Sequence, residues 1–485
     1  MSQPRVRIAP SPTGFLHVGT AHTALFNYLF AKQGGGAMVL RIEDTDLERS
    51  EMRFEKDIFD ELAWLGIEPN ESPLTGGPYA PYRQSERTAT YCPHIERLLA
   101  EGKAFYCFHT QDELEAEKKN LLYEKRPPIH MCEFRTMDVK EAEVLKDTKQ
   151  SYVIRFKTPA GRRILFRDLI RGELEFLTDI LGDFSIAKRV EVPLYHFAVV
   201  VDDYEMKITH VIRGEDHLPN TPKHILLNEA LGFPQPLYAH VSLILGPDRS
   251  KLSKRHGATA ITEFREMGYL PEALINFLGL LGWNPGIERE LFSLDELARE
   301  FSLKGVQKSG AIFDFQKLDW MNGEYIRKKS VAELTDLCIP YFKSSLGVST
   351  ESVSRVFLEA MVSLEQPRLK KLSEIGEKTS YFFSAPLYEK KLLYWKKQTT
   401  QEVAYALERA DKVLANISTQ TSKLEIEAAF FLEIGEDDKG AILWPVRVAL
   451  TGRKASPGPF EIIAVIGRDE ARNRLARAQA LLQKE

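Results

Sequence analysis

Two short segments of the sequence combine residue types that bind phosphate groups. In the first, residues 7–22 read RIAPSPTGFLHVGTAH and place Gly14, His17 and Gly19 between an apolar run and a helical pattern. The glycines fail the G-x-G-x-x-G pattern of dinucleotide sites, and Thr20 stands where the Walker pattern requires lysine. The segment nevertheless leads into a helix N-terminus, whose free N–H groups favour an anion. We therefore expect His17 to donate a hydrogen bond to a phosphate, and Gly19 to leave room for a base or ribose.

A second, basic segment supplies the ammonium groups that the first one lacks. Residues 245–259, LGPDRSKLSKRHGAT, follow an apolar run and place Lys251, Lys254 and Arg255 within five residues of one another. Parallel α/β folds bind ligands at the carboxyl ends of their strands, so a flexible loop at this place would deliver ammonium groups to a triphosphate. The alternatives are a solvated surface loop here and a structural histidine at position 17.

The elements that position these residues follow an α/β rhythm in the first third of the chain. Apolar runs predict strands over 5–9 and 37–42, and apolar residues at helical spacing predict helices over 22–33 and 51–66. Glycines 34–36 end the first helix. Strand, helix, strand and helix in this order indicate parallel strands with a right-handed crossover.

Further strands are expected much later, which indicates an insertion. The runs 197–201, 209–213 and 240–245 are strand candidates, separated from the first pair by a polar stretch at about 85–190 with a helical pattern over 111–125. From about residue 325 onward helical patterns dominate, as in VSRVFLEAMVSLE, EVAYALERADKVLANI and ARNRLARAQALLQKE.

The composition excludes several classes of protein. The 485 residues are 44% apolar and 28% charged with a net charge of −4, which excludes a strongly basic, indiscriminate nucleic-acid binder. Four cysteines are too few for a disulfide scaffold and suit a reducing compartment. No stretch reaches the roughly 18 apolar residues of a membrane span, so we expect a cytoplasmic protein with no membrane contact.

Several motifs in order resemble one enzyme family. HVGT after APSPTGFL resembles the first signature of class I aminoacyl-tRNA synthetases, and KLSKR resembles the second. The linking segments LRIEDTD, PYRQSER, FAVVVDD, THVIRGEDHL and NTPKHILLNEALG are similar to those of bacterial glutamyl-tRNA synthetases. The similarity continues through FDFQKLDWMNGEYIR to PVRVALTG and so covers nearly the whole chain.

The resemblance implies a two-step reaction without a protein nucleophile. Glutamate attacks the α-phosphorus of ATP and expels pyrophosphate, and the terminal ribose of tRNA then attacks the mixed anhydride, so the protein positions groups and stabilises phosphate charge. Mg²⁺ is implied with the triphosphate. Six residues are assigned to ATP by similarity: His17, Gly19, Thr20, Lys251, Lys254 and Arg255. Of these, His17, Lys251 and Lys254 are expected to be catalytic, with Lys254 at the departing pyrophosphate. Thr20 replaces a second histidine of the family's signature.

A glutamate pocket needs cations for two carboxylates and an anion for one ammonium group. Arginines that end strands can fork onto a carboxylate, and a glutamate suits the ammonium group. The resemblance places six residues in this pocket: Arg7, Ala9, Ser11, Glu43, Tyr195 and Arg213. We expect the neighbouring Asp44 and Asp46 to serve as caps and ion-pair partners rather than as catalysts.

Four possible metal ligands form two pairs in the expected insertion. They are Cys107-x-His109 and His130-x-Cys132. Some relatives hold zinc here with C-x-C and C-x-H pairs, a pattern from which this chain departs. A tetrahedral zinc site and a metal-free insertion are both open, and we expect the metal-free one, with no metal ligand among the site residues.

The resemblance also predicts the architecture and the partners. The expected fold is α/β, with a class I Rossmann-like parallel-sheet catalytic domain, an inserted acceptor-binding domain and all-α anticodon-binding domains. The expected boundaries are 1–84 and 191–245 for the catalytic domain, 85–190 for the insertion, 246–324 for a signature-loop and stem-contact domain, and 325–485 for the helical region. The expected partners are tRNA(Glu), L-glutamate and ATP, bound by a monomer, and Arg368 matches an arginine that favours the glutamate anticodon in some relatives.

Other functions share parts of this pattern. Enzymes that charge glutamine have a β-barrel C-terminal half, against which the helical patterns argue, and the length excludes a truncated relative that modifies a tRNA base. An enzyme that also charges tRNA(Gln), and a tRNA-binding paralogue without activity, stay open. Intact His17 and Lys254 weigh against the inactive paralogue.

Overall fold

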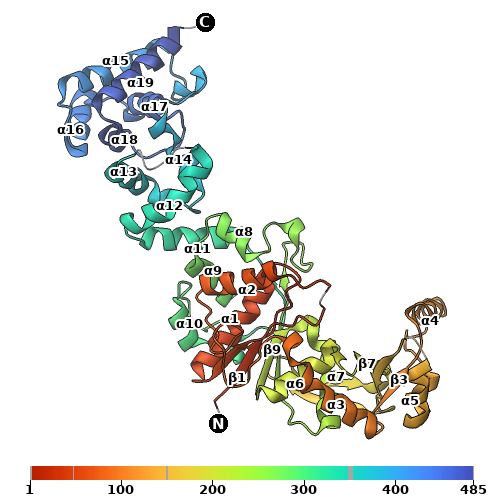
Figure 1. The fold of residues 1–485 in the computed structure, drawn as a ribbon. Coiled ribbons are helices and arrows are strands. Elements are labelled where there is room, and N and C mark those ends of the chain that lie inside the picture. Colours follow the sequence, from red (N-terminus) through yellow and green to blue (C-terminus); the bar gives the residue numbers. More distant parts are fainter. Residues whose placement is uncertain (1–2, 47, 149–150, 348–352, 484–485) are drawn as a thin grey trace. The chain divides into compact units, whose positions relative to one another are not determined.

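The chain divides into two compact units. The computed structural model describes residues 3–46, 48–148, 151–347 and 353–483 (Figure 1). The first unit comprises residues 1–265 and 271–315, and the second comprises 266–270 and 316–485. The first mixes strands and helices and the second is helical, in agreement with the expected class. The finer division into four domains stays a prediction.

Parallel strands form the centre of the first unit. They are β1 (Arg5–Ile8), β2 (Ala37–Leu40), β5 (Arg163–Asp168), β9 (His210–Gly214) and β10 (Leu237–Val241). β1 pairs in parallel with β2, and β10 pairs in parallel with both β9 and β5. A backbone hydrogen bond of 2.9 Å from Thr209 N to Arg5 O joins β1 to the start of β9. The carboxyl ends of β1, β2 and β9 therefore meet at one edge, where ligands of such folds bind.

The first βαβ unit follows from its sequence pattern. Helix α1 (Val18–Gln33) buries an almost continuous apolar side and contacts β1, β2 and β9 (Figure 1). Gly34 caps its C-terminus, and Gly36 is required because a Cβ there would lie 1.8 Å from the carbonyl oxygen of Pro4. Helix α2 (Met52–Trp64) follows β2 and buries Phe54, Ile58 and Leu62 at helical spacing, as predicted.

Of the later strand predictions, one is wrong and another is wrong in part. The run 197–201 lies inside helix α6 (Tyr195–Glu205), which buries every residue from Phe197 to Asp203. A short apolar run buried on all sides lacks the periodicity that separates helix from strand, so the pattern could not decide. The run 240–245 is divided between β10 and the short strand β11 (Ile244–Leu245), with Ser242 and Leu243 between them.

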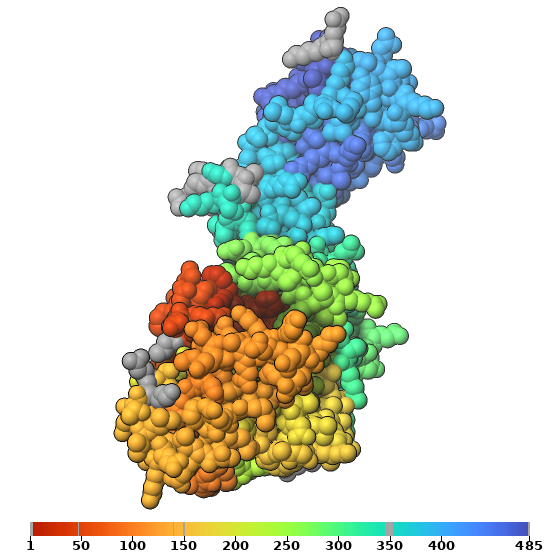
Figure 2. All heavy atoms as spheres, turned by 90° about the vertical axis from the view of Figure 1, so that its right-hand side faces the viewer, coloured from red at the N-terminus to blue at the C-terminus, as the bar shows by residue number. Residues whose placement is uncertain are grey.

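The stretch expected to be an insertion, residues 85–190, contributes most of an antiparallel sheet. β3 (Ala104–Cys107), β4 (Val153–Phe156), β7 (Phe184–Arg189) and β8 (Val192–Pro193) pair in that order, and β6 (Gly172–Leu177) forms a hairpin with β5. Its helices are α3 (Thr88–Ala100), α4 (Gln111–Tyr123) and α5 (Val139–Thr148). Figure 2 shows this stretch, in orange and yellow, as a continuous part of the surface of the first unit. α4 was predicted, whereas the strands of the insertion were not.

The remaining elements complete the two units. The first also contains α7 (Thr221–Leu231), α8 (Ile261–Glu266), α9 (Pro271–Leu280), α10 (Leu294–Glu300) and β12 (Ala311–Ile312), which pairs with β11. The second contains α11 (Phe315–Lys328), α12 (Val331–Leu346), α13 (Arg355–Glu365), α14 (Glu374–Phe383), α15 (Thr400–Asn416), α16 (Lys423–Ile434), α17 (Lys439–Thr451), α18 (Pro459–Ile466) and α19 (Arg468–Gln483). Among the described residues, no helix is both long and apolar enough to span a membrane.

Candidate active site

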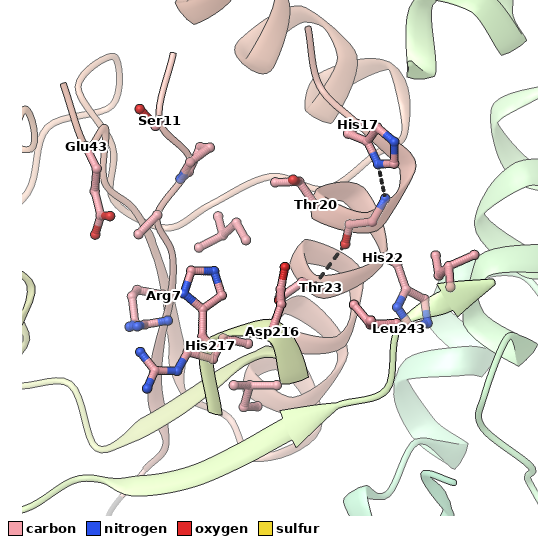
Figure 3. A pocket seen from close by; sticks show the side chains of 18 of the residues that line it. Arg7, Ser11, His17, Thr20, His22, Thr23, Glu43, Asp216, His217 and Leu243 are labelled. Carbon is pink, nitrogen blue, oxygen red and sulfur yellow. Dashed lines mark hydrogen bonds between the residues drawn. The ribbon is translucent and has the colours of Figure 1, made fainter. Parts of the chain in front are cut away.

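A cavity of about 620 Å³ opens at the carboxyl ends of β1, β2 and β9. It brings together all the residues expected to bind glutamate and most of those expected to bind ATP, namely Arg7, Ala9, Ser11, Glu43, Tyr195, Arg213, His17, Gly19, Thr20 and Lys251. Figure 3 shows Arg7 and Glu43 at one end of the cavity and His17 at the other. We name these ends, after the ligands expected there, the amino-acid end and the phosphate end. Lys254 and Arg255 are not among the lining residues.

His17 has one defined tautomer at the start of α1. As the N-cap of the helix, it accepts a hydrogen bond of 3.1 Å at Nδ1 from the backbone N–H of Gly19 (Figure 3). Burial lowers the pKa of His17, and the nearby Lys251 lowers it further, so the ring is neutral near pH 7. With Nδ1 accepting, the proton lies on Nε2, which is thus a donor for a phosphate oxygen next to the N–H groups of the first helical turn.

The basic loop is tied to the first signature. Backbone hydrogen bonds join Val18 N to Thr259 O at 2.8 Å and Ile261 N to Leu16 O at 2.9 Å, so the end of the loop runs beside His17. Leu252 N also bonds to Ile244 O, which closes the first half of the loop as a hairpin. The two signatures are far apart in sequence and form one local structure.

The three loop cations expected to bind ATP differ in their partners. Lys251 Nζ lies 3.1 Å from Asp216 Oδ2 at the cavity, and Arg255 bonds within the loop to Ser250 and Asp248. Lys254 begins a short 3₁₀ turn over Lys254–His256 and is exposed, with no ion pair among the described residues. Its ammonium group is therefore available to a phosphate.

At the amino-acid end, Arg41 organises a buried ion network. Its side chain is fully buried, with Nη1 2.8 Å from Asp203 Oδ1 and Nη2 3.1 Å from Glu43 Oε1. Asp203 also accepts from Arg7 Nε at 3.2 Å, so Arg7 is held by one edge and keeps its terminal nitrogens without a partner among the described residues. Burial raises the pKa of Glu43, whereas Arg41 and Arg7 act to lower it.

Arg213 has no carboxylate partner in this network. It is 5% exposed, and donates from Nε to His240 Nε2 at 3.2 Å and from Nη2 to Thr221 Oγ1 at 2.8 Å, with His224 Nδ1 3.3 Å from Nη1. All three partners are neutral, since burial lowers the pKa of both histidines. Burial also lowers the pKa of Arg213 itself. A buried cation without a counter-ion is costly, and an anionic ligand would compensate it.

The charges at the amino-acid end therefore select a ligand with one net negative charge. The other buried arginines of this network are matched by carboxylates: Arg7, Arg41 and Arg87 face Glu43, Asp202 and Asp203. Among the groups in direct contact, Arg213 is the excess positive charge, because the buried carboxylate of Asp168 reaches it only through neutral His240. Glutamate, with two carboxylates and one ammonium group, carries one net negative charge and would neutralise the site, whereas zwitterionic glutamine would not.

The remaining expected residues take supporting positions. Tyr195 OH lies 3.1 Å from His217 Nδ1, and burial raises the pKa of Tyr195 to about 12. Asp44 accepts from Ser85 N and Oγ, and Asp46 lies 3.8 Å from Arg49, so both are cap and ion-pair partners as expected. The sequence reasoning missed Arg41, Asp203 and the histidines around Arg213. For Arg41 and Asp203 a signal was available in LRIEDTD and FAVVVDD, where charged residues accompany buried runs, whereas the motifs held none for His224 and His240.

The comparisons with known proteins identify the family of this chain. Residues 3–320 match the family model of the catalytic domain of class I tRNA synthetases (E and Q), and residues 333–479 match an anticodon binding domain. The chain is 45% identical to the glutamate–tRNA ligase of Carboxydothermus hydrogenoformans over 97% of this chain and 98% of that protein. It belongs to the glutamyl-tRNA synthetase family.

Further relatives cover the chain equally well. Glutamate–tRNA ligase 1 of Caldicellulosiruptor saccharolyticus is 44% identical over 97% of this chain and 98% of that protein. The crystal structure of a glutamate tRNA ligase from Elizabethkingia meningosepticum in complex with its amino acid is 36% identical, with a TM-score of 0.87 over 99% of this chain and all of that one. The resemblance drawn from the sequence motifs and the expected fold class are thereby confirmed.

In the second unit, Arg368 is held by a buried carboxylate. It ends the 3₁₀ turn Gln366–Arg368, and its Nη1 lies 3.1 Å from Oε2 of Glu365. The Arg368 side chain is 32% exposed, whereas that of Glu365 is 1% exposed and also accepts from Tyr381 OH at 3.0 Å. The carboxylate fixes one side of the guanidinium group, and the exposed part remains available for a base.

The four cysteine and histidine side chains of the insertion converge. Their ligand atoms lie within 4.8 Å of one another, with Cys107 Sγ 3.6 Å from both His109 Nδ1 and His130 Nε2, and Cys132 Sγ 3.7 Å from His109 Nδ1. Zinc bond lengths of about 2.3 Å to sulfur and about 2.0–2.1 Å to nitrogen give tetrahedral S–N edges of about 3.6 Å. Glu117 on α4 contacts Nδ1 of His130, which turns Nε2 toward the sulfurs. The residues present therefore fit zinc.

Proposed function

We propose that this protein ligates L-glutamate to the 3′ end of tRNA(Glu) through a glutamyl-adenylate, releasing pyrophosphate and AMP. The observation that carries the proposal is that the buried Arg213, which has no carboxylate in direct contact, lines the same cavity as the N-terminus of α1, in a chain of this family. Such a pocket binds one carboxylic acid of net negative charge with its reacting carboxylate directed toward ATP. We expect a cytoplasmic monomer.

Each group has a defined part in the first step. Arg213 and Arg7 bind the carboxylates of glutamate, Glu43 accepts from its ammonium group, and Ala9, Ser11 and Tyr195 shape the pocket. His17 donates from Nε2 to a phosphate oxygen of ATP, while Gly19 and Thr20 lie beside the nucleotide. Lys254, with Lys251 and Arg255, neutralises the charge that develops on the departing pyrophosphate. Mg²⁺ accompanies the triphosphate of the substrate. The acceleration comes from orientation and charge stabilisation.

Aminoacylation with purified tRNA species tests the proposal. We expect charging of tRNA(Glu) with glutamate and none with glutamine. Charging with neither amino acid, together with absent ATP–pyrophosphate exchange in the presence of tRNA, would favour an inactive tRNA-binding paralogue. Efficient charging of tRNA(Gln) with glutamate would favour a non-discriminating enzyme.

The choice between the two tRNAs is proposed to depend on Arg368. The glutamate and glutamine anticodons differ at their last base, and a base-reading arginine discriminates by about 1–3 kcal/mol. We therefore expect Arg368→Gln to lower the preference for tRNA(Glu) about 5- to 150-fold, measured as the ratio of kcat/KM on the two tRNAs. Lys370→Gln is the matched control, since an exposed phosphate contact weakens both tRNAs alike. An equal loss of kcat/KM on both tRNAs in Arg368→Gln would reassign Arg368 to the RNA backbone.

For the insertion, the geometry favours the zinc alternative over the metal-free one. We propose a structural zinc ion held by Cys107, His109, His130 and Cys132, with no part in the reaction. The expected content is about one zinc per chain, and Glu117→Gln is expected to lower zinc affinity about 10- to 100-fold because it loosens His130. Metal analysis and competition with a chromogenic chelator measure both quantities. Cys107→Ser should lose the metal and Cys92→Ser should keep it. If wild-type protein expressed in zinc-supplemented medium contains no zinc after purification, the proposal is wrong.

A further inference from the structure

We propose that Asp168, outside the cavity, is a positioning residue that fixes Arg213 for glutamate by setting the tautomer of His240. The inference rests on the proposed role of Arg213 as a carboxylate ligand and extends it to a residue of the expected insertion. Asp168 ends strand β5, which pairs with β10 at Tyr238, two residues before His240.

The carboxylate of Asp168 is fully used by donors. It is 1% exposed. Oδ1 accepts from the backbone N–H groups of Ile170 at 2.9 Å and Arg171 at 2.8 Å. Oδ2 accepts from His240 twice, from the backbone N at 3.1 Å and from Nδ1 at 2.7 Å. Burial acts to raise the pKa of Asp168, but the hydrogen bonds from His240 and the two backbone groups lower it overall. Asp168 is therefore an anion that only accepts.

This arrangement leaves His240 a single tautomer. The imidazole is completely buried, and its lowered pKa keeps it neutral. Because Nδ1 must donate its proton to Asp168, Nε2 carries a lone pair. That lone pair accepts from Arg213 Nε at 3.2 Å and faces Thr221 Oγ1 at 3.0 Å, while Thr221 in turn accepts from Arg213 Nη2. The other tautomer would place an N–H group against the N–H of Arg213.

The imidazole between the two charges has a chemical consequence. A carboxylate in direct contact with Arg213 would neutralise the guanidinium group and compete with the glutamate carboxylate, as Asp203 partly does for Arg7. Through His240, Asp168 orients the guanidinium group of Arg213, and the positive charge of that group stays available to the ligand. The position of Arg213 thus depends on β5, a strand that the sequence assigns to the insertion.

Asp168→Asn tests the assignment because the structure dictates how the amide must turn. Two backbone N–H groups face Oδ1 and only one, that of His240, faces Oδ2, so the amide oxygen takes the place of Oδ1 and the NH₂ group faces His240 Nδ1. Nδ1 must then accept, the proton moves to Nε2, and Arg213 loses an acceptor and gains a repelling donor. We expect the KM for glutamate to rise about 10- to 100-fold, while the KM for ATP stays within about twofold, since an opposed buried donor costs on this scale. Asp179→Asn, an exposed aspartate on the same segment, is the matched control and should change neither.

Two further measurements separate positioning from a purely structural role. ¹⁵N spectra of histidine-labelled protein report the tautomer directly, and His240 should be protonated at Nδ1 in the wild type and at Nε2 in Asp168→Asn. In a His240→Gln background, the side-chain oxygen can accept from Arg213 without help from Asp168, so adding Asp168→Asn should raise the KM for glutamate less than about threefold.

The outcomes decide the proposal independently of the overall function. A wild-type His240 protonated at Nε2, an unchanged KM for glutamate after the tautomer has switched, or fully additive effects in the double variant would each overturn it. If Asp168→Asn does not fold, two other measurements test the proposal. One is the tautomer of His240 in the wild type. The other is the KM for glutamate of His240→Gln compared with that of His240→Ala, where only the glutamine variant is expected to retain glutamate affinity. If the wild type activates no amino acid, the proposed function fails while the tautomer measurement still stands.

Discussion

Replacing Lys254 by alanine is expected to lower kcat for glutamate activation about 100- to 1,000-fold while changing the KM for ATP little. The ammonium group meets more negative charge on the departing pyrophosphate than on bound ATP, so its loss falls on the transition state. Removing one such stabilising donor costs about 2.7–4 kcal/mol. The structure is consistent with this role, because Lys254 is exposed on a loop joined to His17 and has no ion pair among the described residues. ATP–pyrophosphate exchange in the presence of tRNA measures both constants.

The control for Lys254 is Lys308→Ala, an exposed lysine of the same unit that does not line the cavity. It should leave both constants unchanged. Lys251→Ala provides a second comparison. Because Lys251 already pairs with Asp216, this variant is expected to lower kcat less than Lys254→Ala does. An undiminished kcat in Lys254→Ala, or a loss confined to the KM for ATP, would contradict the assignment.

Local pattern predicted the elements that carry the phosphate end of the site. The apolar runs of β1 and β2, the helical spacing of α1 and α2 and the glycines after α1 each depend on neighbours in sequence, so the first βαβ unit could be predicted. His17 and the lysine loop were found for the same reason. Their joining through Val18 and Thr259 could be inferred only from the family resemblance.

The parts that could not be predicted depend on contacts between distant residues. Asp203 contacts Arg7 from 196 positions away, on a helix that the sequence pattern predicted as a strand. A motif places Arg213 in the pocket but does not reveal that its partners are neutral, which is the property that gives the pocket its excess charge. The pairs Cys107-x-His109 and His130-x-Cys132 have opposite order in the sequence. That their side chains converge likewise could not be predicted without the structure.

Arg213→Gln is expected to reduce kcat/KM for glutamate by about 2–5 kcal/mol, or roughly 30- to 5,000-fold, the scale for losing one partner of a buried charge pair. The preference over glutamine should narrow by a similar factor. In the wild type Arg213 has no carboxylate in direct contact, so its charge is matched by a carboxylate of glutamate but not by the neutral amide of glutamine. In the variant this cation is missing, and the glutamate carboxylate is left without its partner.

The thermal stability of Arg213→Gln distinguishes a loss of substrate binding from a loss of folded structure. Arg213 has no carboxylate in direct contact, and glutamine can still donate to one of its neutral partners, so Arg213→Gln should change Tm little, while the KM for ATP stays within about twofold. Arg163→Gln, in an exposed pair with Glu175, is the control and should alter neither Tm nor amino-acid preference. Initial rates with glutamate and glutamine, and thermal unfolding with and without glutamate, provide the comparison. A lowered Tm with an undiminished preference for glutamate would remove Arg213 from the pocket. A preserved Tm, with glutamate no longer raising it, would identify Arg213 as the group that binds the substrate carboxylate.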